Sequence, residues 1–125
     1  MKKLFIQEHK NTPLIDFDGD KGLLEISGRS ISENANEFYK PLLDILTKYI
    51  SKPSSVTLVN IRLEYMNSGT VKCLHEIFKK LEIIPNAATT ITVNWHFEAD
   101  DENMRDVGES FKTLCKLRFV LVEVK

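Results

Sequence analysis

The sequence predicts an α/β fold in which a mixed, largely parallel β-sheet begins with a hairpin and carries about three helices. Two observations predict it. Short runs that alternate apolar and polar residues open the chain, which is typical of strands. Further along, strand-like runs alternate with helix-like stripes, and this order implies right-handed crossovers between parallel strands. The length of 125 residues fits a single domain that spans residues 1–125.

Three extended segments are predicted at the start. They are residues 4–7, residues 14–18, where apolar and acidic side chains alternate, and residues 23–27. The last two are separated by Asp18-Gly19-Asp20-Lys21-Gly22, which supplies residues that tolerate a positive φ. We therefore expect a hairpin here.

A first helix is predicted from Ser30 onward, because Ser30 and Glu33 have the spacing of a capping box. Its apolar stripe consists of Phe38, Leu42, Ile45, Leu46 and Tyr49. Pro41 lies inside this stripe, and an interior proline costs about 3 kcal/mol because it removes a hydrogen bond. We expect a bend or a break near Phe38.

A strand–helix pair follows. Residues 56–65 form the clearest strand, and one of its faces carries Thr57, Val59, Ile61, Leu63 and Tyr65. A sharp junction at residues 66–69 precedes a second helix, whose stripe is Val71, Leu74, Phe78 and Leu81.

The last part of the chain repeats this pattern. Residues 90–97 are rich in β-branched and aromatic residues and predict a strand. After an acidic loop, a third helix is expected to turn Met104, Val107, Phe111 and Leu114 inward. Residues 118–124 predict a final strand.

The charge balance excludes two classes of partner. With 17 basic and 18 acidic side chains and a net charge of −1, the chain lacks the basic excess that binds nucleic acid. It also lacks a polybasic patch for anionic membranes, and its apolar runs are far shorter than the ~20 residues of a membrane-spanning helix. Met1-Lys2-Lys3 is basic, but Gln7 and Glu8 follow too soon for an export signal. We expect a cytoplasmic protein with free thiols.

Histidine and cysteine spacing predicts neither a metal site nor a cofactor. The residues concerned are His9, Cys73, His75, His96 and Cys115, and they show no C-x-x-C or H-x₃₋₅-H pattern. Cys73 and His75 are two apart on a predicted helix and therefore face different directions. This favours a half-buried thiol beside an exposed imidazole over a nucleophile pair.

One alternative function depends on the segment around His96. Alternation places Trp95 and Phe97 in the core and turns His96 away from it. Asp100 and Asp101 stand just before a helix, where acidic groups offset the positive end of the helix dipole. If a cleft held His96 together with Asp100 or Asp101, a small enzyme or ligand-binding domain would be favoured.

The junction between the long strand and the second helix is the most informative segment. Asn67, Ser68 or Thr70 could each cap the helix. Backbone N–H groups and the helix dipole would also favour a phosphate on Ser68 or Thr70. Phosphorylation adds about −1.5 to −2 charges, which is a large local change for a nearly neutral domain.

At this junction the chain resembles the phosphorylation corner of STAS domains of the anti-sigma-factor-antagonist type. More closely, it resembles the SiaC family of bacterial regulatory phosphoproteins. The resemblance extends over nearly the whole chain and is carried, in order, by Thr12-Pro13, residues 28–34, Tyr65-Met66-Asn67-Ser68, Trp95-His96-Phe97 and Glu109-Ser110-Phe111-Lys112.

The resemblance implies a STAS-like fold and a non-enzymatic protein that works by partner switching. A kinase of the histidine-kinase-like ATPase fold adds a phosphate, and a metal-dependent Ser/Thr phosphatase removes it. The unphosphorylated form binds and activates a diguanylate cyclase, which promotes cyclic-di-GMP signalling and biofilm formation. The family's modified residue is a threonine directly after a Tyr-x-Asn triplet. This position is Ser68 here, with Thr70 as a competing acceptor.

The predicted partner-binding residues lie around the corner and along the exposed face of the second helix. They are Tyr65, Met66, Asn67, Gly69, Lys72, His75, Glu76 and Lys79. A third interpretation is a plain assembly module in which Ser68 serves only as a helix cap, so that Ser68→Ala would cost about 1 kcal/mol of stability and leave binding unchanged.

Overall fold

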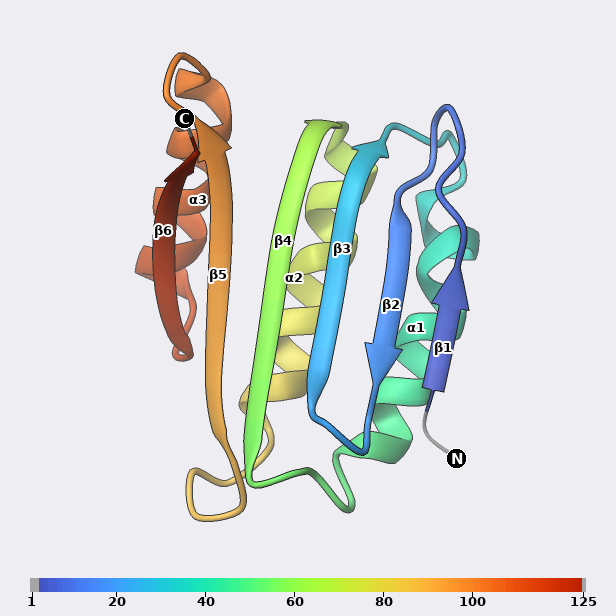
Figure 1. Cartoon of the computed structure of the whole chain (residues 1–125), viewed down its shortest axis with the longest axis vertical. Coiled ribbons are helices and arrows are strands. Elements are labelled where there is room, and N and C mark those ends of the chain that lie inside the picture. The colour runs from blue at the N-terminus through green and yellow to red at the C-terminus, as the bar shows by residue number, and fades with distance from the viewer. Residues whose placement is uncertain (1–2, 125) are drawn as a thin grey trace.

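The computed structural model describes residues 3–124, so Met1 and Lys2, which belong to the segment inspected for an export signal, and Lys125 lie outside it. Within this range, six strands form one sheet in the order β1-β2-β3-β4-β5-β6 (Figure 1). The strands are β1 (Lys3–Ile6), β2 (Leu14–Asp18), β3 (Leu23–Ser30), β4 (Val56–Met66), β5 (Thr90–Glu98) and β6 (Arg118–Val124). β1, β2 and β3 pair antiparallel, and β3 to β6 pair parallel. The predicted mixed, largely parallel sheet with an N-terminal hairpin is confirmed.

Three helices cover one face of this sheet (Figure 1). They are α1 (Ala35–Tyr49), α2 (Ser68–Glu82) and α3 (Glu102–Leu114). Each helix joins two neighbouring parallel strands, and crossovers of one hand that progress in one direction along a sheet place all helices on the same side. The helices therefore all begin at the edge where the parallel strands end.

The core lies between the sheet and the helices. Its largest fully buried side chains are Trp95, Tyr39, Tyr49, Phe17 and Phe78. The alternation predicted for β4 and β5 is confirmed, because the residues assigned to one face are buried: Thr57, Val59, Ile61 and Leu63 in β4, and Trp95 and Phe97 in β5. Tyr65 belongs to the same alternation but is 58% exposed, near the end of β4.

The capping box predicted at Ser30 and Glu33 is wrong. Ser30 is the last residue of β3 and is buried, while α1 begins at Ala35 after Asn34. The hydroxyl of Ser30 lies 2.7 Å from the hydroxyl of Tyr39. A tertiary partner therefore holds the side chain that the local pattern had assigned to a helix cap.

Of the bend or break predicted near Phe38, the break is wrong, because α1 runs without interruption through Pro41. Pro41 and Glu37 are both exposed, so the carbonyl that loses its helical donor lies on the solvent side of the helix. On the other side, Leu42 and Leu46 are fully buried against the core. Burial of this face sustains the helix in spite of the proline.

α3 is held close to the sheet by Trp95. The indole Nε1 donates a hydrogen bond to the carbonyl of Met104 at 3.0 Å. A Cβ added to Gly108 would stand 2.4 Å from Cδ1 of Trp95, so only glycine permits this approach. Met104 and Phe111 face the core as predicted, but Leu114 is 71% exposed, which corrects its predicted inward position. Leu114 follows Met104 by ten residues, and at about 100° per residue this places it about 80° away from Met104 around the helix axis.

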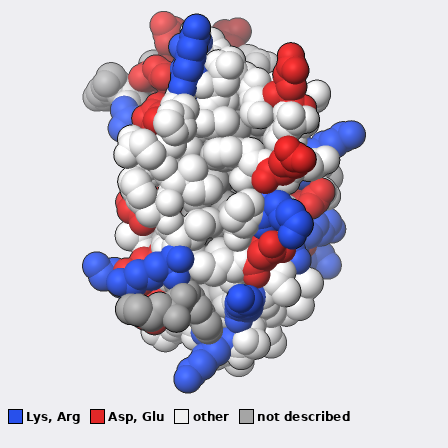
Figure 2. All heavy atoms as spheres, turned by 90° about the vertical axis from the view of Figure 1, so that its right-hand side faces the viewer, with Lys and Arg blue, Asp and Glu red and all other residues white. Residues whose placement is uncertain are grey.

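On the side of the molecule that Figure 2 shows, the surface charges are distributed rather than concentrated. On the side formed by β1 and α1, acidic and basic side chains are interspersed and leave a broad uncharged area (Figure 2). Within the described part of the chain, no helix is long and apolar enough to cross a membrane.

Candidate functional site

Asn67 is the helix cap at the corner between β4 and α2. It is the only residue between the two elements, and its Oδ1 accepts a hydrogen bond from the N–H of Thr70 at 2.9 Å. Its Nδ2 donates to the carbonyl of Ser32 at 2.9 Å. Of the three capping candidates in the sequence, Asn67 therefore fills the role, and it also ties the segment before α1 to the start of α2.

The hydroxyl of Thr70 is enclosed in the fold. Thr70 is fully buried, and its Oγ1 lies 2.7 Å from both the carbonyl oxygen and the Oγ of Ser30 and 3.0 Å from the Oδ1 of Asn67. The network continues to Tyr39, whose pKa is raised by burial, so that its phenol stays neutral. A kinase reaches this hydroxyl only if the corner opens.

The surroundings of Ser68 differ from those of Asn67 and Thr70. Ser68 is the first residue of α2 and is exposed, and its hydroxyl makes no hydrogen bond to any of residues 3–124. The next residue, Gly69, packs so closely on Ala35, the first residue of α1, that an added Cβ would stand 3.2 Å from the Cβ of Ala35. The starts of α1 and α2 are therefore side by side, and both helix dipoles direct their positive ends toward this corner.

Tyr65 and Met66 form the strand side of the corner. The ring of Tyr65 is exposed, and the guanidinium of Arg29 lies 4.9 Å from its centroid, which is a cation–π contact. Met66 is half-buried and pairs with Ser30 in the sheet register. Tyr65 is thus a surface aromatic close to Ser68.

The predicted face of α2 is exposed and borders a groove. Lys72, His75, Glu76 and Lys79 are all exposed. A groove of about 520 Å³ lies between α2 and α3 and is lined by Val71, Lys72, His75, Glu76, Val107, Ser110, Phe111 and Leu114. The α3 side of this α2–α3 groove was not foreseen in the sequence. The sequence signal that could have indicated it is the position of Leu114, which lies about 80° from Met104 around α3.

The thiols have no nucleophilic character. Cys73 is fully buried, more than the half-buried position expected, and its Sγ lies 3.5 Å from the Oδ1 of Asn36. Burial raises the pKa of Cys73, and it raises the pKa of Cys115 to about 11. A reactive cysteine needs a lowered pKa. Among residues 3–124, no group of three or more His, Cys, Asp or Glu side chains is placed to hold a metal ion.

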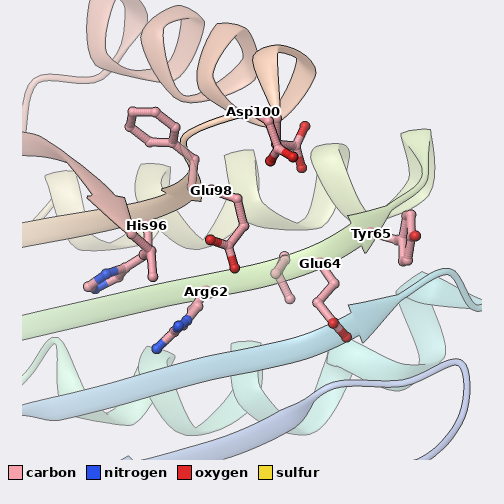
Figure 3. A pocket seen from close by; sticks show the side chains of 10 residues that line it. Arg62, Glu64, Tyr65, His96, Glu98 and Asp100 are labelled. Atoms are coloured by element: carbon pink, nitrogen blue, oxygen red, sulfur yellow. The ribbon is translucent and has the colours of Figure 1, made fainter.

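A shallow pocket of about 220 Å³ lies at the carboxyl ends of β4 and β5 and does bring His96, Asp100 and Asp101 together (Figure 3). However, Asp101 is the cap of α3, since its Oδ1 accepts from the N–H of Met104 at 3.0 Å. This confirms the predicted capping role. In Figure 3, His96 and Asp100 point away from each other, with Glu98 between them.

The charge that acts on His96 in this pocket comes from Arg62 rather than from the two aspartates. Burial lowers the pKa of His96, and the nearby positive charge of Arg62 lowers it further. No ion pair within residues 3–124 joins His96 to Asp100 or Asp101. The pairing of His96 with an aspartate that the enzyme alternative requires is therefore not formed among the described residues.

Sequence comparison identifies the family. Residues 6–124 match the SiaC family of regulatory phosphoproteins. The chain belongs to the SiaC family. The resemblance seen in the sequence is thereby confirmed, and it extends over nearly the whole chain.

Solved structures of SiaC have the same fold. The apo form of SiaC from Pseudomonas aeruginosa is 25% identical, with 98% of this chain and 99% of that chain covered and a TM-score of 0.87. SiaC from the same organism in complex with the diguanylate cyclase SiaD, which it activates, is 24% identical, with coverage of 97% and 99% and a TM-score of 0.88. An uncharacterized protein of Pseudomonas aeruginosa strain UCBPP-PA14 is 25% identical over 121 residues, which is 97% of this chain and 96% of that protein.

Proposed function

We propose that this SiaC-family chain is a non-enzymatic, cytoplasmic signalling protein that is switched by reversible phosphorylation of Ser68. The observation that carries the proposal is the division of roles at the corner. Asn67 caps the helix and Thr70 is buried in a hydrogen-bond network, whereas the exposed hydroxyl of Ser68 has no structural task. A group that can be modified without loss of the fold is what a switch requires.

The proposed partners follow from the family. A kinase of the histidine-kinase-like ATPase fold adds the phosphate, and a metal-dependent Ser/Thr phosphatase removes it. The unphosphorylated form binds and activates a diguanylate cyclase, which links the protein to cyclic-di-GMP signalling and biofilm formation. The complex of SiaC with the cyclase SiaD supports this choice of output partner.

The geometry of the corner suits a phosphate on Ser68. The amides of Thr70 and Val71 already donate to Asn67, and the earlier N–H groups of the first turn remain for an anion. The added charge of about −1.5 to −2 would stand on an otherwise nearly neutral domain and would repel an acidic partner surface. Phosphorylation is therefore expected to change docking rather than the fold.

The acceptor is tested by incubating the protein with its kinase and ATP and locating the phosphate by mass spectrometry. We expect one phosphate, on Ser68, and none on the Ser68→Ala variant. Ser55→Ala is the matched control, because Ser55 is an exposed serine at the opposite end of β4. A phosphate found only on Thr70, or none on residues 67–70, would contradict the proposal.

The switch itself is tested by cyclase activation. Unphosphorylated wild-type protein should activate the diguanylate cyclase of its own organism, and the phosphorylated form should not. Ser68→Asp should bind the cyclase more weakly than wild type, since even one added charge opposes docking. Equal binding by Ser68→Asp and Ser68→Ala would count against an electrostatic switch.

A further inference from the structure

The α2–α3 groove begins about one helical turn after the proposed phosphorylation site. Ser68, Lys72, His75 and Lys79 follow one stripe of α2, at intervals of four, three and four residues. Lys72 and His75 line the groove. A phosphate on Ser68 would therefore stand at one end of the groove, one turn before the groove wall begins.

Lys72 is an unengaged cation at this end of the groove. It is exposed, and no carboxylate among residues 3–124 forms an ion pair with it. It lies four residues after Ser68, about 6 Å along the helix axis. An acidic group four residues before a lysine is the favourable orientation for a helical ion pair, so a phosphate on Ser68 is well placed to engage Lys72.

The floor of the groove is apolar. Val71 from α2 and Val107 and Phe111 from α3 line it, and Leu114, which also lines it, leaves 71% of its surface exposed. Such a surface, bordered by polar residues, is typical of a docking site.

The α2 rim of the groove is cationic at the end next to Ser68. Lys72 stands there, and Glu76, which also lines the groove, lies one turn further along α2, whereas Lys79 and Glu82 line the neighbouring hollow. A partner segment with apolar side chains and a carboxylate would match both the floor and the rim.

We propose that Lys72 is the contact for which the two states of Ser68 compete. In the unphosphorylated protein, Lys72 binds a carboxylate on an apolar segment of the output partner that lies in the α2–α3 groove. In the phosphorylated protein, the phosphate of Ser68 engages Lys72 and repels that carboxylate. This inference rests on the proposed function, because it takes Ser68 as the modified residue and the cyclase as the partner.

The intramolecular half of the proposal is tested without any partner. Phosphoserine is incorporated genetically at position 68 of the full chain, and its second ionisation is followed by ³¹P NMR. Lys72→Gln should raise the pKa of the phosphoserine by roughly 0.3, since a helical ion pair of this kind is lost. Lys79→Gln is the matched control and should leave the pKa unchanged, because it lies about 16 Å along the helix from Ser68. Identical titrations of wild type and Lys72→Gln would overturn the pairing.

The docking half is tested by measuring the affinity of the unphosphorylated protein for the purified cyclase. Leu114→Gln and Lys72→Gln should each weaken binding about fivefold or more, and Lys72→Gln should also shrink the effect of phosphorylation. Ile83→Gln is the control for Leu114, because Ile83 is 68% exposed but does not line the groove. Lys48→Gln, on α1, is the control for Lys72.

Two results would overturn the docking half. One is equal affinity of Leu114→Gln and Ile83→Gln. The other is an effect of phosphorylation that is the same in wild type and Lys72→Gln. If the proposed function is wrong, the result is different: the wild-type protein does not bind the cyclase at all. The NMR experiment does not involve the cyclase, so Lys72→Gln should still raise the pKa of the phosphoserine and Lys79→Gln should still leave it unchanged.

Discussion

Two hydroxyls two residues apart have opposite environments at the corner. Ser68 is exposed and Thr70 is fully buried, although both could be capping residues or phosphate acceptors by sequence alone. The difference arises from α2 itself, because residues two apart on a helix point in different directions. Once Asn67 caps the helix, Thr70 faces β3 and Ser68 faces solvent.

The first prediction contrasts these two hydroxyls. Thr70→Val should lower the free energy of unfolding by about 1–3 kcal/mol, because it leaves buried hydrogen-bonding groups of Ser30 and Asn67 without their partner. Ser68→Ala should change it by less than about 0.5 kcal/mol, as for other exposed positions. Urea unfolding measures both free energies.

Asn67→Ala is the control, because Asn67 is the residue that caps the helix, and it should cost about 1 kcal/mol. If Ser68→Ala cost as much as Asn67→Ala, Ser68 would be a structural cap, as the assembly-module interpretation requires.

The second prediction concerns the pH dependence that His96 confers. Burial, with a contribution from Arg62, lowers its pKa in the folded protein, so the unfolded chain binds the proton more readily. The corresponding stability is fully present above the unfolded value of about 6.5 and is lost as the pH falls through the folded pKa. His96→Gln should therefore lose less stability than wild type when the pH is lowered from about 7 to about 5.

Arg62→Gln provides the complementary test of the cause. Removing this charge should raise the pKa of His96, as measured by NMR titration of the imidazole, but only in part, because burial is the larger contribution. An unchanged His96 titration in Arg62→Gln would show that the arginine does not act on it.

A local sequence pattern predicted the role of a capping side chain correctly where its hydrogen-bond partner is also close in the sequence. Asp101 was expected at the start of a helix and does cap it through the N–H of Met104, three residues away. Ser30 had an equally good local pattern, but its partners Tyr39 and Thr70 belong to α1 and α2. No single-sequence signal indicates that a hydroxyl 40 residues away is the competing partner.

At the scale of elements, the position of α3 on the sheet depends on one glycine, Gly108. Gly108→Ala would force a methyl group to within 2.4 Å of the buried Trp95 ring. We expect a loss of about 1–3 kcal/mol from overpacking, which exceeds the gain in helix propensity of about 1 kcal/mol at most. Urea unfolding followed by tryptophan fluorescence measures this loss.

Gly69→Ala is the matched control for this third prediction. It is also a helical glycine, but its added methyl group would meet the Cβ of Ala35 at 3.2 Å and the Oδ1 of Asn67 at 3.6 Å, both longer than the contacts at Gly108. Its loss of stability should therefore be clearly smaller than that of Gly108→Ala. Equal losses would show that the two contacts with Trp95 and Ala35 are equally tolerant.

The position of α3 on the sheet also limits how much of the α2–α3 groove could be predicted. The helices themselves were predictable from their apolar stripes. The approach of α3 to the sheet depends instead on the close contact of Gly108 with Trp95 of β5. Periodicity describes which side of a helix is buried, not how far it lies from its neighbour.

For the whole molecule, the strand order argues for an interaction surface rather than a ligand crevice. Open α/β sheets bind ligands where the strand order reverses, because the crossovers there move to opposite faces. Here the order runs from β3 to β6 without reversal and all helices cover one face (Figure 1). The alternation of strands and helices predicted parallel strands joined by crossovers but not their order in the sheet, and the carboxyl edge carries the shallow pocket of Figure 3.

The fourth prediction follows from placing a charge on such an edge. Phosphoserine at position 68 should leave the far-UV circular dichroism unchanged and should not lower the melting temperature, because a negative group at a helix N-terminus is favourable by about 0.3–1 kcal/mol. Its effect on cyclase binding should weaken with added salt, since the screening length falls from about 10 Å at 0.1 M to about 3 Å at 1 M.

Position 55 provides the control for this comparison. Phosphoserine placed there, at the start of β4, carries the same charge on the same nearly neutral molecule but lies at the opposite edge of the sheet. It should leave cyclase binding intact at every salt concentration, because only a charge near the α2–α3 groove opposes docking. If both modified proteins lost binding equally, net charge rather than position would control the partner. If only position 68 mattered but the protein melted at lower temperature, the phosphate would act by loosening the corner.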